Sequence, residues 1–143
     1  ESLRTVLMTD LKRAYESLEG HSLVLCKGDI LITDDGRGIS TLIGLVHDGK
    51  SFDGFSAADT IVGKAAAMLF VKLGVTSVHA VVMSASAMRL FEYNSVIFEY
   101  DTITDLIVNR KGDGPCPMEA AVSDTFDVEQ GICLLTRQID SMR

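Results

Sequence analysis

The stretch from Ser56 to Leu73 constrains the fold more than any other part of this 143-residue sequence. Between Thr60 and Val71 it carries a single charge, on Lys64, so a helix formed here is apolar nearly all round. Its first residues, Ser-Ala-Ala-Asp, have the form of a capping box, and Gly74 follows where a C-terminal cap belongs. The pattern predicts one long helix that is buried on most sides.

Shorter patterns on either side predict strands that alternate with helices. Apolar and β-branched runs predict strands at residues 22–26, 30–33, 78–83 and 95–100, and helical spacing predicts helices at residues 2–19, 39–46, 85–91, 101–108 and from 128 onward. Strand–helix–strand units in a chain of this length fold most simply as layers around one core. We therefore expect a single α/β domain spanning residues 1–143, a three-layer α/β/α sandwich with a mixed sheet.

The composition limits the partners of this domain. Thirteen Lys and Arg against twenty Asp and Glu give a net charge of −7, which disfavours nucleic acid and anionic membrane surfaces as partners. The longest run without a charged residue, Leu73 to Met88, is shorter than the roughly 20 apolar residues that cross a bilayer. Three cysteines without a Cys-x-x-Cys pair favour reduced thiols and a cytoplasmic protein.

Four short stretches occur in an order that is typical of one known family. They are Gly36-Arg37-Gly38, the residues from Ser56 to Ala67, Asn109-Arg110, and the block Gly-Pro-Cys-Pro-Met-Glu from Gly114 to Glu119. Through these stretches the sequence resembles the uncharacterised bacterial and archaeal family DUF1893, from about Leu23 to the last helix. The predicted helix at residues 2–19 lies outside this match. The resemblance implies a cytidine deaminase-like fold.

The residues needed for zinc-dependent deamination are missing from this sequence. Zinc deaminases bind the metal with a His or Cys at the start of one buried helix and two Cys at the start of the next. Here the first predicted helix begins with Ala57-Ala58-Asp59, and the second with Ser84-Ala85-Ser86-Ala87. Neither start supplies a ligand, and no pair of histidines has metal-ligand spacing. We therefore expect neither a metal nor another cofactor.

Lys64 is the first candidate for a functional residue. An ammonium group within an apolar helix must pair with an anion, extend to the surface or lower its pKa. Lys64 could bind an anionic ligand or act as a base on the floor of a pocket, and it could equally form a structural ion pair. Gly63 before it would let a ligand approach closely, although close packing on the sheet explains a glycine equally well.

Asp59, Cys116 and Glu119 are further candidates for catalytic residues. Asp59 could move a proton or pair with a cation, although a capping role already explains it. Cys116 precedes Pro117, which prefers the first position of a helix, so its thiol would lie at an N-cap that favours the thiolate. Glu119 falls in the first turn of that helix. A buried, unreactive cysteine is the competing interpretation.

Arg37, Arg110 and Gly114 are candidates for binding an anion. Arg37 lies between two glycines ahead of a helix start, and Arg110 precedes the glycine-rich turn that ends at Gly114. In both places backbone amides and a guanidinium could meet a phosphate or a carboxylate. Neither stretch fits a known phosphate-binding fingerprint, and solvent-exposed loop arginines are the alternative.

These candidates lead to two hypotheses about function. In the first, the domain binds an unidentified small molecule, nucleotide-like or an anionic metabolite, near the N-terminal end of the 56–73 helix, and could be a metal-independent enzyme. Lys64 and Arg110 would then hold the anionic part, while Asp59 or Glu119 positions it or moves a proton. In the second, the domain is a non-enzymatic interaction or regulatory protein whose apolar helix faces and six methionines form a homo-oligomer interface.

Overall fold

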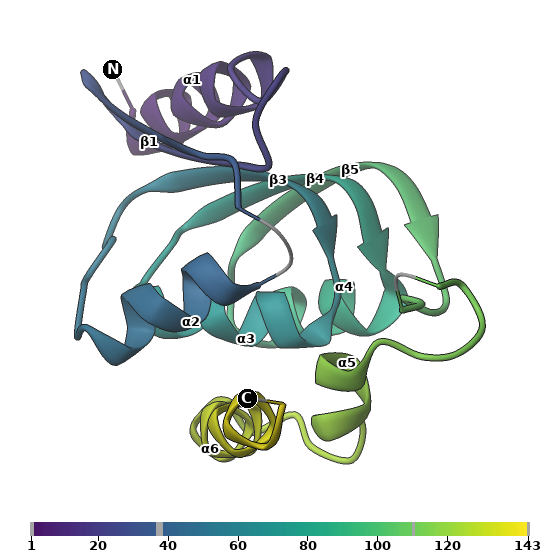
Figure 1. The fold of residues 1–143 in the computed structure, drawn as a ribbon. Coiled ribbons are helices and arrows are strands. Elements are labelled where there is room, and N and C mark those ends of the chain that lie inside the picture. Colours follow the sequence, from purple (N-terminus) through teal and green to yellow (C-terminus); the bar gives the residue numbers. More distant parts are fainter. Residues whose placement is uncertain (1, 37–38, 110, 143) are drawn as a thin grey trace.

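The computed structural model describes every residue except 1, 37, 38, 110 and 143 (Figure 1). Its helices are α1 (Leu3–Glu16), α2 (Ser40–His47), α3 (Lys64–Leu73), α4 (Ala85–Tyr93), α5 (Pro117–Ala121) and α6 (Val128–Ser141). Its strands are β1 (Leu23–Lys27), β2 (Ile30–Asp34), β3 (Ser56–Val62), β4 (Ser77–Ser84) and β5 (Ile97–Thr104). None of the helices in the described part of the chain is both long and apolar enough to cross a membrane.

The five strands form one mixed sheet in the order β2-β1-β3-β4-β5. β1 runs antiparallel to both of its neighbours, and β3, β4 and β5 are parallel to one another. The hairpin between β1 and β2 turns at Gly28, whose φ of 57° is the left-handed conformation that glycine adopts without strain. The α/β class and the mixed sheet predicted from the sequence are therefore confirmed.

Helices cover both faces of the sheet (Figure 1). α1 lies on one face, against β1, β3 and β4, and the layer of α2, α3 and α4 lies on the other. α5 and α6 lie beyond α3 and pack against it, so they add an outer layer to the expected sandwich. The main core fills the space between the sheet and α3, and a smaller cluster around Ala14, Leu18 and Ala58 lies beneath α1.

The single long helix predicted for residues 56–73 is wrong. Residues Ser56–Val62 form β3, the helix begins only at Lys64, and Gly63 is its N-cap. The predicted cap at Gly74 is correct, because this glycine has a φ of 88°. Ala57 and Ala58 are fully buried on opposite faces of the sheet, where their small side chains let helices pack closely. Tertiary burial therefore overrides the helix propensity of alanine.

The short helix predicted for residues 101–108 is also wrong. β5 continues to Thr104 and stays paired with β4 as far as Ser84. Its end carries the alternating sequence Thr-Ile-Thr, whose β-branched residues favour a strand over a helix. Asp101, expected to cap a helix, instead extends from the sheet toward α1.

Candidate functional site

Three of the predicted candidates, Gly63, Lys64 and Glu119, meet where β3 ends and α3 begins. β3 ends at Val62 and is followed by Gly63 and α3, whereas β4 ends at Ser84 and is followed directly by α4. Because β3 and β4 are parallel neighbours, the N-termini of α3 and α4 lie side by side at the carboxyl edge of the sheet. In open α/β sheets this edge is the usual place for a ligand.

Glu119 binds the N-terminus of α3 with both of its carboxylate oxygens. The amide of Lys64 donates to Oε1 over 2.8 Å, and the amide of Ala65 donates to Oε2 over 2.7 Å. A β-carbon added at Gly63 would collide with this carboxylate. Gly63 is thus needed for the close approach of Glu119, and the first free amides of α3 already have an anionic partner.

The ammonium group of Lys64 also has partners within the chain. Its Nζ donates to the backbone carbonyls of Ser123 at 3.1 Å and Thr125 at 2.8 Å, and it lies 4.2 Å from the centre of the Phe126 ring. Burial lowers the pKa of Lys64, against the opposite influence of the carboxylates of Glu119 and Asp124. Lys64 therefore holds the segment between α5 and α6 against the start of α3.

Asp59 lies apart from this cluster, on β3. It pairs in register with Leu23 of β1 and Ala80 of β4, and within the described part of the chain no hydrogen bond or ion pair joins it to Lys64 or Glu119. Desolvation raises the pKa of Asp59 to about 8, although the amides of Thr60 and Ile61 hydrogen-bond its carboxyl group. This half-buried carboxyl group is therefore mostly protonated at neutral pH.

Cys116 is the N-cap of α5, and Pro117 is the first residue of that helix, as the sequence predicted. The thiol is half-buried and packs against the main core. Gly114 accepts a hydrogen bond from the amide of Asn109 at 2.8 Å, which closes the turn before α5. The predicted ligand-binding residues Arg37 and Arg110 lie outside the described residues.

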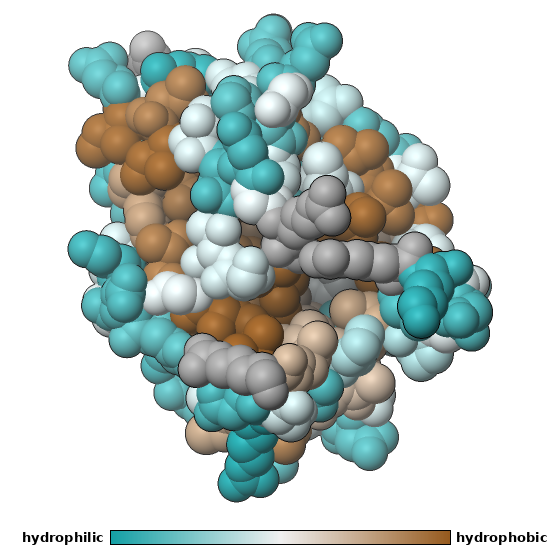
Figure 2. Space-filling model, in the orientation of Figure 1, coloured by the Kyte–Doolittle hydropathy of each residue, from teal (hydrophilic) through white to brown (hydrophobic). Residues whose placement is uncertain are grey.

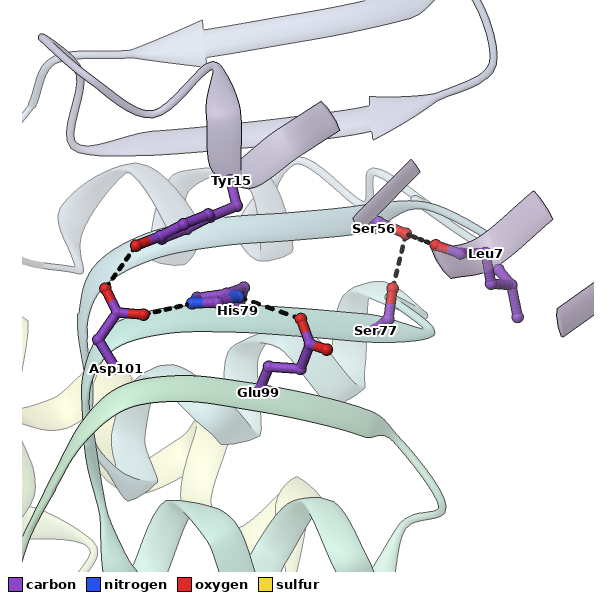
Figure 3. A network of polar contacts seen from close by, with 7 residues as sticks. All are labelled: Leu7, Tyr15, Ser56, Ser77, His79, Glu99 and Asp101. Carbon is purple, nitrogen blue, oxygen red and sulfur yellow. Dashed lines mark hydrogen bonds and ion pairs between the residues drawn. The ribbon is translucent and has the colours of Figure 1, made fainter. Parts of the chain in front are cut away.

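One polar network was missed by the sequence reasoning (Figure 3). On the face of the sheet beneath α1, His79 Nδ1 lies 3.2 Å from Glu99 Oε1, and Nε2 lies 2.9 Å from Asp101 Oδ1. The ring of Tyr15 from α1 stacks on the imidazole at a centroid distance of 3.8 Å, and its hydroxyl donates to Asp101 Oδ2 over 2.6 Å. The network attaches α1 to β4 and β5.

Hydrogen bonds set the ionisation of this network. Those from Tyr15 and His79 lower the pKa of Asp101, so its carboxylate remains charged, and the same contact with Asp101 raises the pKa of Tyr15. The alternation of Glu99 and Asp101 was a usable signal, because residues two apart on a strand share one face. The expectation of a helix from residue 101 concealed it.

The family model for the domain of unknown function DUF1893 (TM1506) matches residues 13–139 of this chain. The chain belongs to the DUF1893 family. The match begins within α1 and ends within α6, so it includes every strand and all the predicted site residues. No curated protein matches the chain.

A crystal structure of a DUF1893 family protein (TM1506) from Thermotoga maritima has a similar fold. The two chains are 25% identical with a TM-score of 0.81, and the similarity covers 96% of this chain and 92% of that one. The comparison therefore supports the family and the fold of this DUF1893 protein, without assigning a reaction.

The two helix starts that the sequence comparison set against the zinc ligands of deaminases lie at other residues in the structure. The first of the two helices starts at Gly63-Lys64 and not at Ala57-Ala58-Asp59, while the second starts at Ala85 with Ser84 as its cap. Neither start carries an imidazole or a thiol. Among the residues that the structure describes, no group of three or more His, Cys, Asp or Glu is arranged to hold a metal ion.

Proposed function

We propose that this DUF1893 protein binds a small, uncharged polar molecule with an amide-like edge, such as a nucleobase, beside Asp59 in the middle of β3. The observation that carries the proposal is Asp59, a half-buried carboxyl group with a pKa near 8. A protonated carboxyl group donates one hydrogen bond and accepts another, so it can form a two-point contact with a lactam or an amidine-like ring edge.

The cluster at the start of α3 argues for an uncharged ligand rather than an anion, because its groups already have partners. An anionic ligand at the start of α3 would have to displace Glu119 from the amides of Lys64 and Ala65. It would also have to draw the Lys64 ammonium away from two backbone carbonyls. Of the two ligand classes expected from the sequence, the nucleotide-like class is therefore favoured, with its base as the part that is recognised.

The sheet supports a deaminase-like scaffold for this site. The parallel strands β3 and β4 are each followed by a helix that starts at the carboxyl edge, and the antiparallel β1 flanks them. If a reaction takes place, Asp59 is the group to donate a proton, because a pKa close to the working pH suits a general acid. We propose no metal for such a step.

The test is thermal unfolding with a panel of nucleobases and nucleosides between pH 6 and pH 9. The proposal expects one of them to raise the melting temperature below pH 8, with the effect fading above pH 8 as Asp59 ionises. Asp59→Ala should abolish the shift, and the matched variant Asp105→Ala, at an exposed position on the loop after β5, should keep it. An unchanged response in Asp59→Ala, or no response from any compound, would refute the proposal.

A second candidate function, self-association, is favoured by the free edge of the sheet. β2 is the edge strand, and Ile30, Leu31 and Ile32 are 52%, 40% and 41% exposed. Apolar surface gathers over the β1–β2 hairpin at the upper left of Figure 2. An uncovered apolar edge strand is a template for pairing with a further strand. The one charge of β2, on Asp34, is engaged by Thr41 and Gly36.

We infer that the occupant of this edge is β2 of a second copy, because two such edges pair antiparallel about a twofold axis without bringing free like charges together. The molar mass in solution tests this inference. The wild-type protein should be a dimer and Ile32→Lys a folded monomer, since a lysine on an edge strand blocks pairing. A monomeric wild-type protein at high concentration would exclude this interface.

A further inference from the structure

The network beneath α1 contains a histidine that faces two carboxyl groups (Figure 3). The imidazole of His79 lies on β4, with Nδ1 3.2 Å from an oxygen of Glu99 and Nε2 2.9 Å from an oxygen of Asp101. A carboxylate only accepts hydrogen bonds, whereas a neutral imidazole has one N–H and one nitrogen with a lone pair. Both contacts with carboxylates are therefore hydrogen bonds only when the ring carries two protons and a positive charge.

The other groups around this imidazole do not supply a positive charge. Its neighbour on β3 is Ala58, and from α1 the phenol ring of Tyr15 stacks on it at an interplanar angle of 23°. Lys12 and Glu16 of α1 lie at exposed positions. Within the described part of the chain, no hydrogen bond or ion pair joins a lysine or an arginine to the two carboxyl groups that the imidazole contacts. The charge on the imidazole therefore decides the electrostatics of the network.

The helix α1 is attached to the sheet by two polar anchors and by an apolar cluster much smaller than the main core. The first anchor is at the hairpin turn, where Asp10 accepts a bond from the amide of Gly28 at 3.2 Å and Arg13 donates to the carbonyl of Gly28. The second is Tyr15, which donates to Asp101 over 2.6 Å. The last turn of α1 is therefore held to β4 and β5 by the network around the histidine.

We propose that the proton on His79 controls how firmly the last turn of α1 is held on the sheet. With two protons, the imidazole binds both carboxylates and keeps Asp101 in the position where it accepts the bond from Tyr15. With one proton, a ring nitrogen would face a carboxylate with its lone pair, and the repulsion would open that contact. The attached form thus binds a proton that the loosened form does not need, so a rise in pH favours the loosened form.

Two observations support this coupling. Histidine is the side chain whose charge ordinarily changes between pH 5 and pH 8, so a modest change in pH is enough to act on the contact. The hydrogen bonds from Tyr15 and His79 also lower the pKa of Asp101, so this carboxylate keeps its charge over the whole of that range. Loosening of the turn would uncover Leu18 and Val81, which pack in the small cluster beneath α1.

The test combines two NMR measurements on the whole chain between pH 5 and pH 9. Long-range proton–nitrogen spectra report the protonation of His79, because the two ring nitrogens have similar shifts in an imidazolium and different shifts in a neutral ring. Hydrogen exchange reports the attachment of the turn. We expect an imidazolium at pH 5, and we expect the protection of the amides of residues 13–18, relative to those of α3, to fall at least fivefold as the ring loses its proton.

The variants separate this proton from other titrating groups. In His79→Gln the fall in protection should vanish, whereas the matched control His21→Gln, which removes a histidine paired with Asp35, should keep it. Glu99→Gln, at an exposed position, should reduce the fall at least twofold, because its amide can donate to a neutral ring. A fall that survives in Asp59→Asn separates this proposal from the proposed function. A neutral ring at pH 5, constant protection while the ring titrates, or an equal fall in His79→Gln would overturn it.

Discussion

The contact between Gly63 and Glu119 gives the sharpest test of how this site is built. In Gly63→Ala the new β-carbon would lie 2.7 Å from Oε2 of Glu119, closer than real β-carbons approach any atom. The backbone itself tolerates alanine, because Gly63 has a φ of −95° and a ψ of −175°, an extended conformation. The cost of this substitution must therefore come from the displaced carboxylate.

The structure sets the size of that cost. Displacing the carboxylate removes hydrogen bonds of 2.8 and 2.7 Å from the first amides of α3. Loss of a helix cap costs about 1–2 kcal/mol, and loss of a negative charge at a helix N-terminus adds about 0.5 kcal/mol. We expect Gly63→Ala to lower the free energy of unfolding by about 2 kcal/mol, which corresponds to roughly 6–8 °C in melting temperature for a chain of this size.

Urea unfolding of a double-mutant cycle with Glu119→Ala isolates the contact. Glu119→Ala alone should cost about 2 kcal/mol for the same reason, and Gly63→Ala added to it should change stability by less than about 0.5 kcal/mol. The matched control is Gly44→Ala in α2, where a β-carbon meets nothing within 4 Å. That variant should be neutral or more stable, since alanine is the better helix former.

The result that would refute this reasoning is additivity. If Gly63→Ala costs the same in the wild type and in Glu119→Ala, the glycine is required for another reason and the carboxylate is not the neighbour that matters. A cost in Gly44→Ala equal to that in Gly63→Ala would point to a general intolerance of glycine replacement.

Three further predictions concern the charged groups. Lys64→Met should lower the free energy of unfolding in urea by about 1–3 kcal/mol, because two backbone carbonyls lose their hydrogen-bond donor. A gain in stability would show that the buried ammonium group destabilises the fold. Asp59 keeps its proton to about pH 8 in the folded state but only to about pH 4 in the unfolded state, so it destabilises the folded state increasingly between these pH values. The free energy of unfolding of Asp59→Asn should therefore equal that of the wild type near pH 4 and exceed it at pH 8 by a few kcal/mol at most. Tyr15→Phe should raise the pKa of Asp101 measured by NMR, and an unchanged pKa would exclude the hydroxyl as its cause.

The parts of the fold that follow a local rule were predictable from the sequence. Asp127 caps α6 by accepting from the amide of Gln130, as its position ahead of an apolar helical pattern indicated. The β1–β2 hairpin and β4 also follow their expected patterns. Both errors were helices predicted where the structure has a strand: all of β3 at residues 56–62, and the end of β5 at residues 101–104. In each case pairing within the sheet decided the outcome, and no local pattern reports that pairing.

The error at residues 56–62 changes the meaning of the predicted site. An ammonium group within a helix would have to find its partner nearby, but at the first position of α3 Lys64 can reach the segment between α5 and α6. Glu119 reaches back in the opposite direction to the amides of α3. Glu119 thus satisfies the start of the helix that Lys64 begins, and Lys64 satisfies two carbonyls of the segment that follows the helix of Glu119. The same shift places Asp59 within β3, where no capping interaction accounts for it, and a carboxyl group in such a place is the one most in need of a functional explanation.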